Sequence, residues 1–179
     1  PLIAAVVRDD QLIIPRGDNH LRDGDLVYFI SEEKNLFKHL SIFDKHATPV
    51  KRVLIVGGGR IGFRLAKQLE DKSLSCKVVE KRASRCDFLA ERLNRTVVLH
   101  GDGSDQSLLV EENIDETDLV VALTGDEEAN ILASLLAKRL GAKKVMALIN
   151  KPAYAELVEA GTIDIAISPS QITLGTLLA

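Results

Sequence analysis

The hydrophobic pattern of the chain changes once, near residue 50. Before that point, short apolar runs at 2–7, 11–14 and 26–30 are separated by turn-forming stretches rich in Asp, Gly and Asn. Short apolar runs bounded by such turns are typical of strands. Ser31 is placed to cap a short helix over 32–43. This part of the chain therefore predicts a β-rich module that is too small to be stable alone.

After a linker at 46–50, apolar runs alternate with longer segments of helical period. The expected strands are 53–56, 77–80, 96–99, 119–123, 145–149 and 163–167. The expected helices are 60–71, 83–93, 105–113, 127–140 and 152–160. Neighbouring parallel strands need long crossover connections, and these helices supply them. Residues 51–179 therefore predict an α/β fold, a Rossmann-type doubly wound parallel six-stranded sheet.

The segment 127–140 has the clearest helical pattern. Acidic residues at 126–128 suit the positive end of a helix dipole, and Gly141 follows a basic last turn. Its apolar stripe consists of Leu132, Leu135, Leu136 and Leu140. The spacing predicts that these leucines form the buried face of the helix.

Composition narrows the classes of function. The 179 residues include 23 Lys and Arg against 26 Asp and Glu, a net charge of −3, and only 4% aromatic residues. A nucleic-acid polymer needs clustered basic residues and aromatic platforms, so nucleic-acid binding is not expected. Cys76 and Cys86 are too few and too badly spaced for a disulfide framework or a zinc site, which favours a reducing compartment.

The hydropathy and the ends of the chain give two further expectations. No apolar run approaches the roughly 18 residues of a membrane span, so direct membrane insertion is not expected. The chain starts at Pro1 without an initiator methionine, and no charged residue follows Asp164. We therefore expect a piece of a longer polypeptide.

A glycine-rich motif follows the first strand of the α/β region. It reads Gly57-x-Gly59-x-x-Gly62 and stands between a strand and a helix, as dinucleotide-binding loops do. Gly57 suits a tight turn, Gly59 close approach of a pyrophosphate, and Gly62 helix–strand packing. The N–H groups at the helix start are expected to receive the phosphate charge. The alternative is a tight turn without a ligand.

Glu80 is the second element of this pattern, 23 residues after Gly57 at the end of the next strand. A carboxylate there accepts hydrogen bonds from ribose hydroxyls and repels a 2′-phosphate, which favours NAD over NADP. Lys81 and Arg82 follow directly and keep NADP open, because an arginine beside the acid accommodates a phosphate.

Arg60 stands at the crest of the glycine loop. Its planar guanidinium suits a terminal phosphate, which would favour ADP or ATP over a dinucleotide. The alternative is a solvated arginine on the first helical turn. Gly62 is followed by Phe63 and Arg64 rather than by Lys and Ser or Thr, which excludes a P-loop.

Two more loops follow the third and fourth strands, at the edge where open α/β sheets bind ligands. Asp102 is a candidate for the adenine edge or the ribose, or alternatively a cap for the next helix. Thr124 is a candidate for the phosphates or the second ribose, although an N-cap at Thr124 or Asp126 explains that loop as well.

Patterns that carry catalysis are missing from the sequence. It has no Tyr-x-x-x-Lys pair, no HExxH, no GxSxG and no His-rich cluster. His100 is either a general base or, more simply, a polar residue at a strand end. A nicotinamide enzyme also needs a substrate domain, for which this chain offers almost no residues. We expect no catalytic residues and no metal site.

Several motifs together resemble an RCK (KTN) domain, most closely those of the peripheral subunits of bacterial Trk potassium uptake systems. These motifs are the run 57–62, Glu80, and the runs 101–105, 123–130 and 164–169. Residues 3–30 are similar to the end of an RCK C domain. The resemblance implies a partial RCK C domain with a short linker helix at 1–45 and an RCK N domain at 51–179.

The resemblance also implies a regulatory role. RCK domains bind NAD or NADH, or alternatively ATP or ADP, and assemble as homo-oligomers, from dimers to tetrameric rings, beneath a membrane potassium transporter or channel. The expected nucleotide-binding residues are Gly57, Gly59, Arg60, Ile61, Gly62, Glu80, Lys81, Asp102, Gly103 and Thr124. The implied protein is cytoplasmic, peripheral to the inner face of the plasma membrane, and not an enzyme. The alternative is a fragment of an NAD-dependent oxidoreductase that lacks its substrate domain.

The segment after the last strand is a further expectation from the resemblance. In the family a helix there swaps between subunits, and here it would begin within 168–174. Its apolar residues Ile172, Leu174, Leu177 and Leu178 are expected at a subunit interface, with packing inside one subunit as the alternative.

Overall fold

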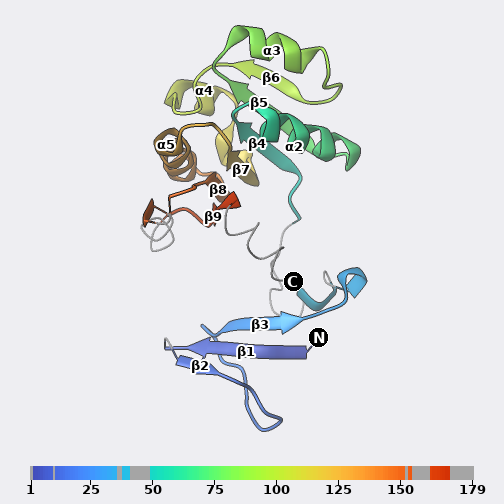
Figure 1. Cartoon of the computed structure of the whole chain (residues 1–179), viewed down its shortest axis with the longest axis vertical. Helices are drawn as coiled ribbons and strands as arrows, with labels where there is room; N and C mark the ends of the chain where they lie inside the picture. Colours follow the sequence, from blue (N-terminus) through green and yellow to red (C-terminus); the bar gives the residue numbers. More distant parts are fainter. Residues whose placement is uncertain are drawn as a thin grey trace. The chain divides into compact units, whose positions relative to one another are not determined.

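The chain forms two compact units, Pro1–Pro49 and Val50–Ala179, in a computed structural model (Figure 1). The structure describes residues 2–9, 11–35, 38–40, 49–151, 153–154 and 162–169. Most of the expected helix 152–160 and the expected swapped helix lie outside these residues. Of the expected helix 32–43, the structure describes a 3-10 turn at Glu33–Asn35 and part of the remainder. In the described residues, no helix has the length and apolar character to cross a membrane.

The first unit is a three-stranded antiparallel sheet, which confirms the three short strands predicted for it. Its strands are β1 (Leu2–Arg8), β2 (Gln11–Ile13) and β3 (Leu26–Ile30), in the order β2-β1-β3. The guanidinium of Arg8 donates two hydrogen bonds to the Asp25 carboxylate, both at 2.7 Å, and so joins the end of β1 to the turn before β3.

The second unit contains a six-stranded, all-parallel sheet, as predicted. Its order is β6-β5-β4-β7-β8-β9, so the chain runs outward from β4 to β6 and then returns to the other side of β4. The strands are β4 (Arg52–Val56), β5 (Ser75–Glu80), β6 (Val97–His100), β7 (Leu119–Ala122), β8 (Lys144–Leu148) and β9 (Ile165–Ile167). The reversal creates a topological switch point between β4 and β7, where folds of this class bind ligands.

Helices cover both faces of this sheet (Figure 1). They are α2 (Arg60–Asp71), α3 (Ala83–Ala90), α4 (Gln106–Glu111) and α5 (Glu127–Arg139), with a 3-10 turn η2 at Ile114–Glu116. Strand β4 shows why two layers form. Its Val53 and Ile55 pack with α2 and α3, whereas Leu54 and Val56 pack with α4 and α5. A continuous apolar strand is therefore buried on both faces.

The buried face of α5 differs from the expected leucine stripe. The residues it buries are Asn130, Ala133, Ser134 and Ala137. Leu132 is 57% exposed and Leu135 is 37% exposed, so the prediction is wrong for these two. Leu136 and Leu140 are partly buried against the core. Small side chains let the helix approach the sheet closely, and the larger leucines take its flanks.

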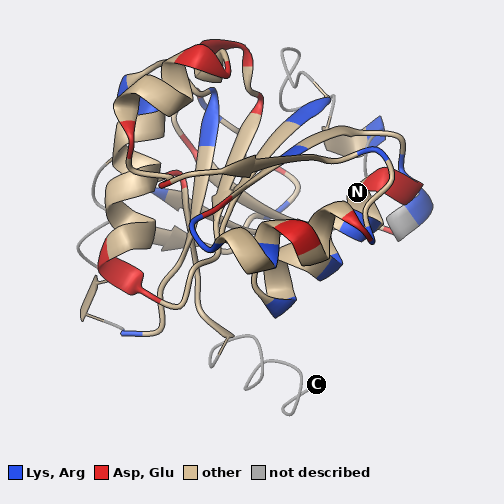
Figure 2. Ribbon diagram, turned by 90° about the horizontal axis from the view of Figure 1, so that it is seen from above, with Lys and Arg blue, Asp and Glu red and all other residues tan. Residues whose placement is uncertain are grey.

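The first turn of α5 contains Glu127 and Glu128, and its last turn contains Lys138 and Arg139, at opposite ends of the helix (Figure 2). This distribution complements the helix dipole, as the sequence suggested. Asp126 caps the helix, since its side chain accepts a hydrogen bond from the Ala129 N–H at 2.9 Å.

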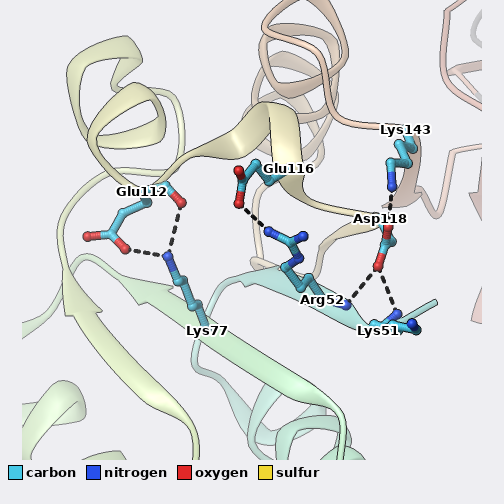
Figure 3. A network of polar contacts seen from close by, with 7 residues as sticks. All are labelled: Lys51, Arg52, Lys77, Glu112, Glu116, Asp118 and Lys143. Atoms are coloured by element: carbon cyan, nitrogen blue, oxygen red, sulfur yellow. Dashed lines mark hydrogen bonds and ion pairs between the residues drawn. The ribbon is translucent and has the colours of Figure 1, made fainter.

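Charged side chains close the end of the sheet where the strands begin (Figure 3). The Asp118 carboxylate accepts hydrogen bonds from the backbone N–H of Lys51 at 2.8 Å and of Arg52 at 2.9 Å, and from the Lys143 ammonium at 2.6 Å. It thereby joins the segments that precede β4, β7 and β8. The bond from Lys143 is the largest cause that lowers the pKa of Asp118 below its usual value, followed by the two backbone N–H groups.

Replacing Asp118 by alanine is expected to lower the free energy of unfolding by about 1–3 kcal/mol, because two backbone N–H groups lose a charged acceptor. Urea unfolding measures this change. Since the pKa of Asp118 is lowered in the folded state, its contribution is present above the unfolded pKa and disappears on acidification. Glu116→Gln is the control, because it weakens only the exposed Arg52–Glu116 ion pair. Equal effects of the two substitutions would contradict the role of Asp118.

Candidate functional site

A cleft of about 750 Å³ lies at the carboxyl ends of β4, β5, β6 and β7, at the switch point of the sheet. Its volume is in the range of small-molecule sites. Seven of the ten residues predicted to bind nucleotide line it: Gly57, Gly59, Glu80, Lys81, Asp102, Gly103 and Thr124. The fold therefore brings together loops that are far apart in the sequence.

The segment 57–62 comprises the loop between β4 and α2 and the first residues of α2, and its Gly57 and Gly59 line the cleft. Gly57 has φ of +104°, and a Cβ added there would lie 2.9 Å from the backbone nitrogen of Thr124. A Cβ on Gly62 would lie 2.0 Å from the carbonyl oxygen of Gly57, so this glycine lets α2 start against the loop. A Cβ on Gly59 would meet nothing within 4 Å, which leaves space above the loop.

Backbone N–H groups at the start of α2 are available to a ligand. The first helical bond runs from the Phe63 N–H to the Gly59 carbonyl at 3.0 Å. Within the described part of the chain, no acceptor contacts the N–H groups of residues 59–62. Unpaired N–H groups and the positive end of the helix dipole together make a site for an anion such as a phosphate.

The lining of the cleft does not include Arg60, Ile61 or Gly62. Arg60 is exposed, and its side chain makes no hydrogen bond or ion pair with any residue that the structure describes. Ile61 is 52% exposed. The structure therefore places Arg60 and Ile61 on the first helical turn as sources of backbone N–H groups, and the contact of Arg60 with a terminal phosphate stays a prediction.

Glu80 ends β5 and is 7% exposed. Its Oε2 accepts a hydrogen bond from the Gly58 N–H at 2.8 Å, and its Oε1 accepts bonds from the Arg82 N–H at 3.0 Å and Nε at 3.3 Å. Burial opposes ionisation, but these bonds outweigh it and lower the pKa of Glu80. The carboxylate thus stays charged and holds the glycine loop, while Oε2, which accepts a single hydrogen bond, keeps a lone pair for a ribose hydroxyl.

Lys81 and Asp102 form an ion pair at the rim of the cleft, with 2.7 Å between Nζ and Oδ2. The other carboxylate oxygen of Asp102 accepts bonds from the Ser104 N–H at 3.0 Å and hydroxyl at 2.8 Å. The bond from Lys81 is the largest cause that lowers the pKa of Asp102 to about 2. Asp105 rather than Asp102 caps α4, since it accepts from the Ser107 N–H at 2.9 Å, so the capping alternative for Asp102 is wrong.

Thr124 is held by Asn130, a residue for which the sequence suggested no role. The fully buried Asn130 accepts hydrogen bonds from the Thr124 N–H at 2.8 Å and hydroxyl at 2.6 Å. It also donates to the carbonyls of Thr124 at 3.2 Å and Leu148 at 3.0 Å. In the sequence, the feature that could have indicated this role is that Asn130 lies on the same face of α5 as Ala133, Ser134 and Ala137.

Arg85 and His100 contact residues of the predicted site. Arg85 of α3 donates hydrogen bonds to the carbonyls of Gly58 and Gly59, which the sequence did not predict. His100 lies outside the cleft lining, exposed, with its Nε2 3.1 Å from the Lys81 carbonyl oxygen. In the described residues no group of three or more His, Cys, Asp and Glu side chains is arranged to hold a metal ion.

Comparison with known proteins agrees with this geometry. The TrkA-N domain family matches residues 53–169. The Trk system potassium uptake protein TrkA of Halomonas elongata is 51% identical over 176 residues, which are 98% of this chain and 38% of the relative. The chain therefore spans well under half the length of this relative. These matches confirm the resemblance to the subunits of Trk potassium uptake systems that the sequence motifs indicated.

Solved structures share the fold of the second unit. The TrkA-N domain of the inner membrane protein ybaL from Escherichia coli matches 74% of this chain and 97% of its own, with a TM-score of 0.63 and 16% identity. The GsuK channel bound to NAD matches 75% of this chain and 25% of its own, with a TM-score of 0.59 and 19% identity. GsuK bound to ADP matches 76% of this chain and 38% of its own, with a TM-score of 0.60 and 18% identity. With its parallel sheet, its glycine loop and the match over 53–169, the chain belongs to the TrkA-N domain family.

Proposed function

We propose that this chain is the nucleotide-binding part of a TrkA-type regulatory subunit of a potassium uptake system, with NAD or NADH, or alternatively ADP or ATP, in the cleft. The observation that carries the proposal is the row of unpaired N–H groups at residues 59–62, which starts at Gly59 in the lining of a cleft of suitable size. The TrkA relative and the NAD- and ADP-bound GsuK structures support the same interpretation.

In this proposal each part of the cleft receives one part of the ligand. The pyrophosphate lies over the N-terminus of α2, where the N–H groups and the helix dipole favour negative charge. The adenosine ribose donates its hydroxyls to Glu80, and Asp102 lies near the same nucleoside. The second half of a dinucleotide extends towards Thr124. A 2′-phosphate would meet the Glu80 carboxylate, which disfavours NADP.

The regulatory role places the protein beside a membrane. A TrkA-type subunit would work as a homo-oligomer, from a dimer to a tetrameric ring, on the cytoplasmic face of a TrkH-like transporter subunit. A nucleotide changes uptake only if it binds two conformations of that assembly with different affinities. The subunit would itself catalyse no reaction, in contrast to the alternative of an NAD-dependent oxidoreductase fragment.

A thermal-unfolding titration tests the proposal. A nucleotide at 100 times its dissociation constant should stabilise the fold by about 2.7 kcal/mol, because it binds only the folded chain. We expect stabilisation by NAD, NADH, ADP or ATP, and a smaller effect of NADP at equal concentration. The same samples are assayed spectroscopically for oxidation or reduction of the nicotinamide. Absence of any nucleotide effect would contradict nucleotide binding, and turnover would favour the oxidoreductase.

A further inference from the structure

We propose that Arg85 is a positioning residue for phosphate binding: it turns the carbonyl groups of the glycine loop away from the ligand so that the N–H groups face it. The inference rests on the proposed nucleotide function. Arg85 lies on α3, outside the motif, and the guanidinium donates from Nε to the Gly58 carbonyl at 2.6 Å and from Nη2 to the Gly59 carbonyl at 3.2 Å.

The Gly58 peptide groups are held from two sides by charged side chains. Its N–H donates to the Glu80 carboxylate at 2.8 Å, while its carbonyl accepts from Arg85. Gly58 precedes Gly59, the N-cap of α2, so no helical N–H donates to its carbonyl among the described residues. Arg85 is therefore the donor that holds this carbonyl among the described residues, and the Gly59 N–H of the same peptide group faces the opposite way.

Aromatic contacts fix the Arg85 guanidinium in this place. It lies over the ring of Phe88, with 4.2 Å between Cζ and the ring centroid. The Phe88 ring in turn makes an edge-to-face contact with Phe63 of α2 at 5.6 Å between centroids. Arg92 also lies over Phe88, at 3.9 Å, but its hydrogen bonds go to the Phe88 carbonyl and to Glu91. Arg92 thus shares the stacking of Arg85 without its contact to the loop.

Replacement of Arg85 is expected to weaken the binding of a ligand that carries phosphate, whereas replacement of Arg92 is not. Without the guanidinium, the Gly58 carbonyl loses its hydrogen-bond donor and is free to rotate, whereas the Gly59 carbonyl keeps the Phe63 N–H. A Gly58 carbonyl that turns into the cleft repels a phosphate. Glu80 would then be the only charged side chain that holds Gly58 among the described residues, through the Gly58 N–H. Adenosine, which has no phosphate, should not sense this change because its ribose is expected at Glu80.

The experiment compares Arg85→Met with Arg92→Met, a matched control because both substitutions keep a long apolar stem over Phe88 and remove a cation. Calorimetry measures the binding of ADP, NAD and adenosine. Arg85→Met should weaken ADP and NAD about 10-fold or more, from the loss of charged hydrogen bonds, and change adenosine binding by less than about twofold. Arg92→Met should change all three by less than about twofold.

Hydrogen exchange of the unliganded protein gives a readout that needs no nucleotide. Exchange at residues 57–62 should accelerate in Arg85→Met and not in Arg92→Met. Arg85→Lys, which keeps the charge but lacks the planar fork of the guanidinium, should show an intermediate loss of ADP affinity and serves if Arg85→Met does not fold. Equal loop exchange and equal ADP affinity in the two methionine variants would overturn the proposal. A wild-type chain that binds neither ADP nor NAD would refute nucleotide binding, while loop exchange would still decide the role of Arg85.

Discussion

Gly62→Ala is expected to lower the free energy of unfolding by about 3 kcal/mol, because the added methyl group fits only if the neighbouring backbone moves. The Cβ would lie 2.0 Å from the Gly57 carbonyl oxygen and 3.3 Å from a methyl carbon of Ile55. Backbone at the end of β4 cannot yield as a flexible side chain would, so α2 must move away from the loop. Urea unfolding measures the stability, and calorimetry with ADP measures the accompanying loss of binding.

Gly59→Ala is the matched control on the same loop. Gly59 has φ of −62° and ψ of −164°, which alanine adopts, and its Cβ would meet nothing within 4 Å. The fold should therefore keep its stability to within about 1 kcal/mol. Because Gly59 lines the cleft, the methyl group should still hinder the approach of a pyrophosphate. A Gly62→Ala variant as stable as Gly59→Ala would show that the helix and loop are not in close contact.

The sequence predicts α2 at both ends, from 60 to 71, because a glycine loop precedes it and polar residues follow it. The start of β5 is predicted wrongly, because the sequence pattern places it at residue 77. This strand begins at Ser75, whose N–H donates to the Lys51 carbonyl at 2.9 Å. Ser75 and Lys77 are polar, so the hydrophobic pattern hides their place in the ladder. Strand ends depend on pairing with a distant neighbour, which periodicity alone does not carry.

The candidate site also contains residues that the sequence predicts and residues that it does not. The motif spacing predicts the glycine loop and Glu80, because the covalent path from strand to helix determines their positions. Arg85 contacts carbonyls 26 and 27 residues earlier in the chain, and Glu80 bonds to an N–H 22 residues earlier. These contacts depend on how α3 packs beside the loop. A pattern of residue types along one segment contains no information about that packing.

Glu80→Gln is expected to lower the free energy of unfolding by about 2–4 kcal/mol at neutral pH, because an amide replaces a buried charged acceptor and turns an N–H group towards another donor. The partners at risk are the N–H groups of Gly58 and Arg82, which now share the two carboxylate oxygens. Ribose loses an anionic acceptor as well, so we also expect NAD to bind about 10- to 100-fold more weakly. Urea unfolding and calorimetry measure the two effects.

The stability difference between the wild type and Glu80→Gln should depend on pH with a definite sign. The pKa of Glu80 is lowered from the usual 4.5, so its charge contributes stability above that value and loses it as the pH falls through the folded-state pKa. The difference should therefore be constant near neutrality and shrink below about pH 4.5. Glu128→Gln is the control, since Glu128 also lines the cleft but is exposed and pairs with Lys151. A difference for Glu80 that persists unchanged into acid would mean that its volume, and not its charge, holds the loop.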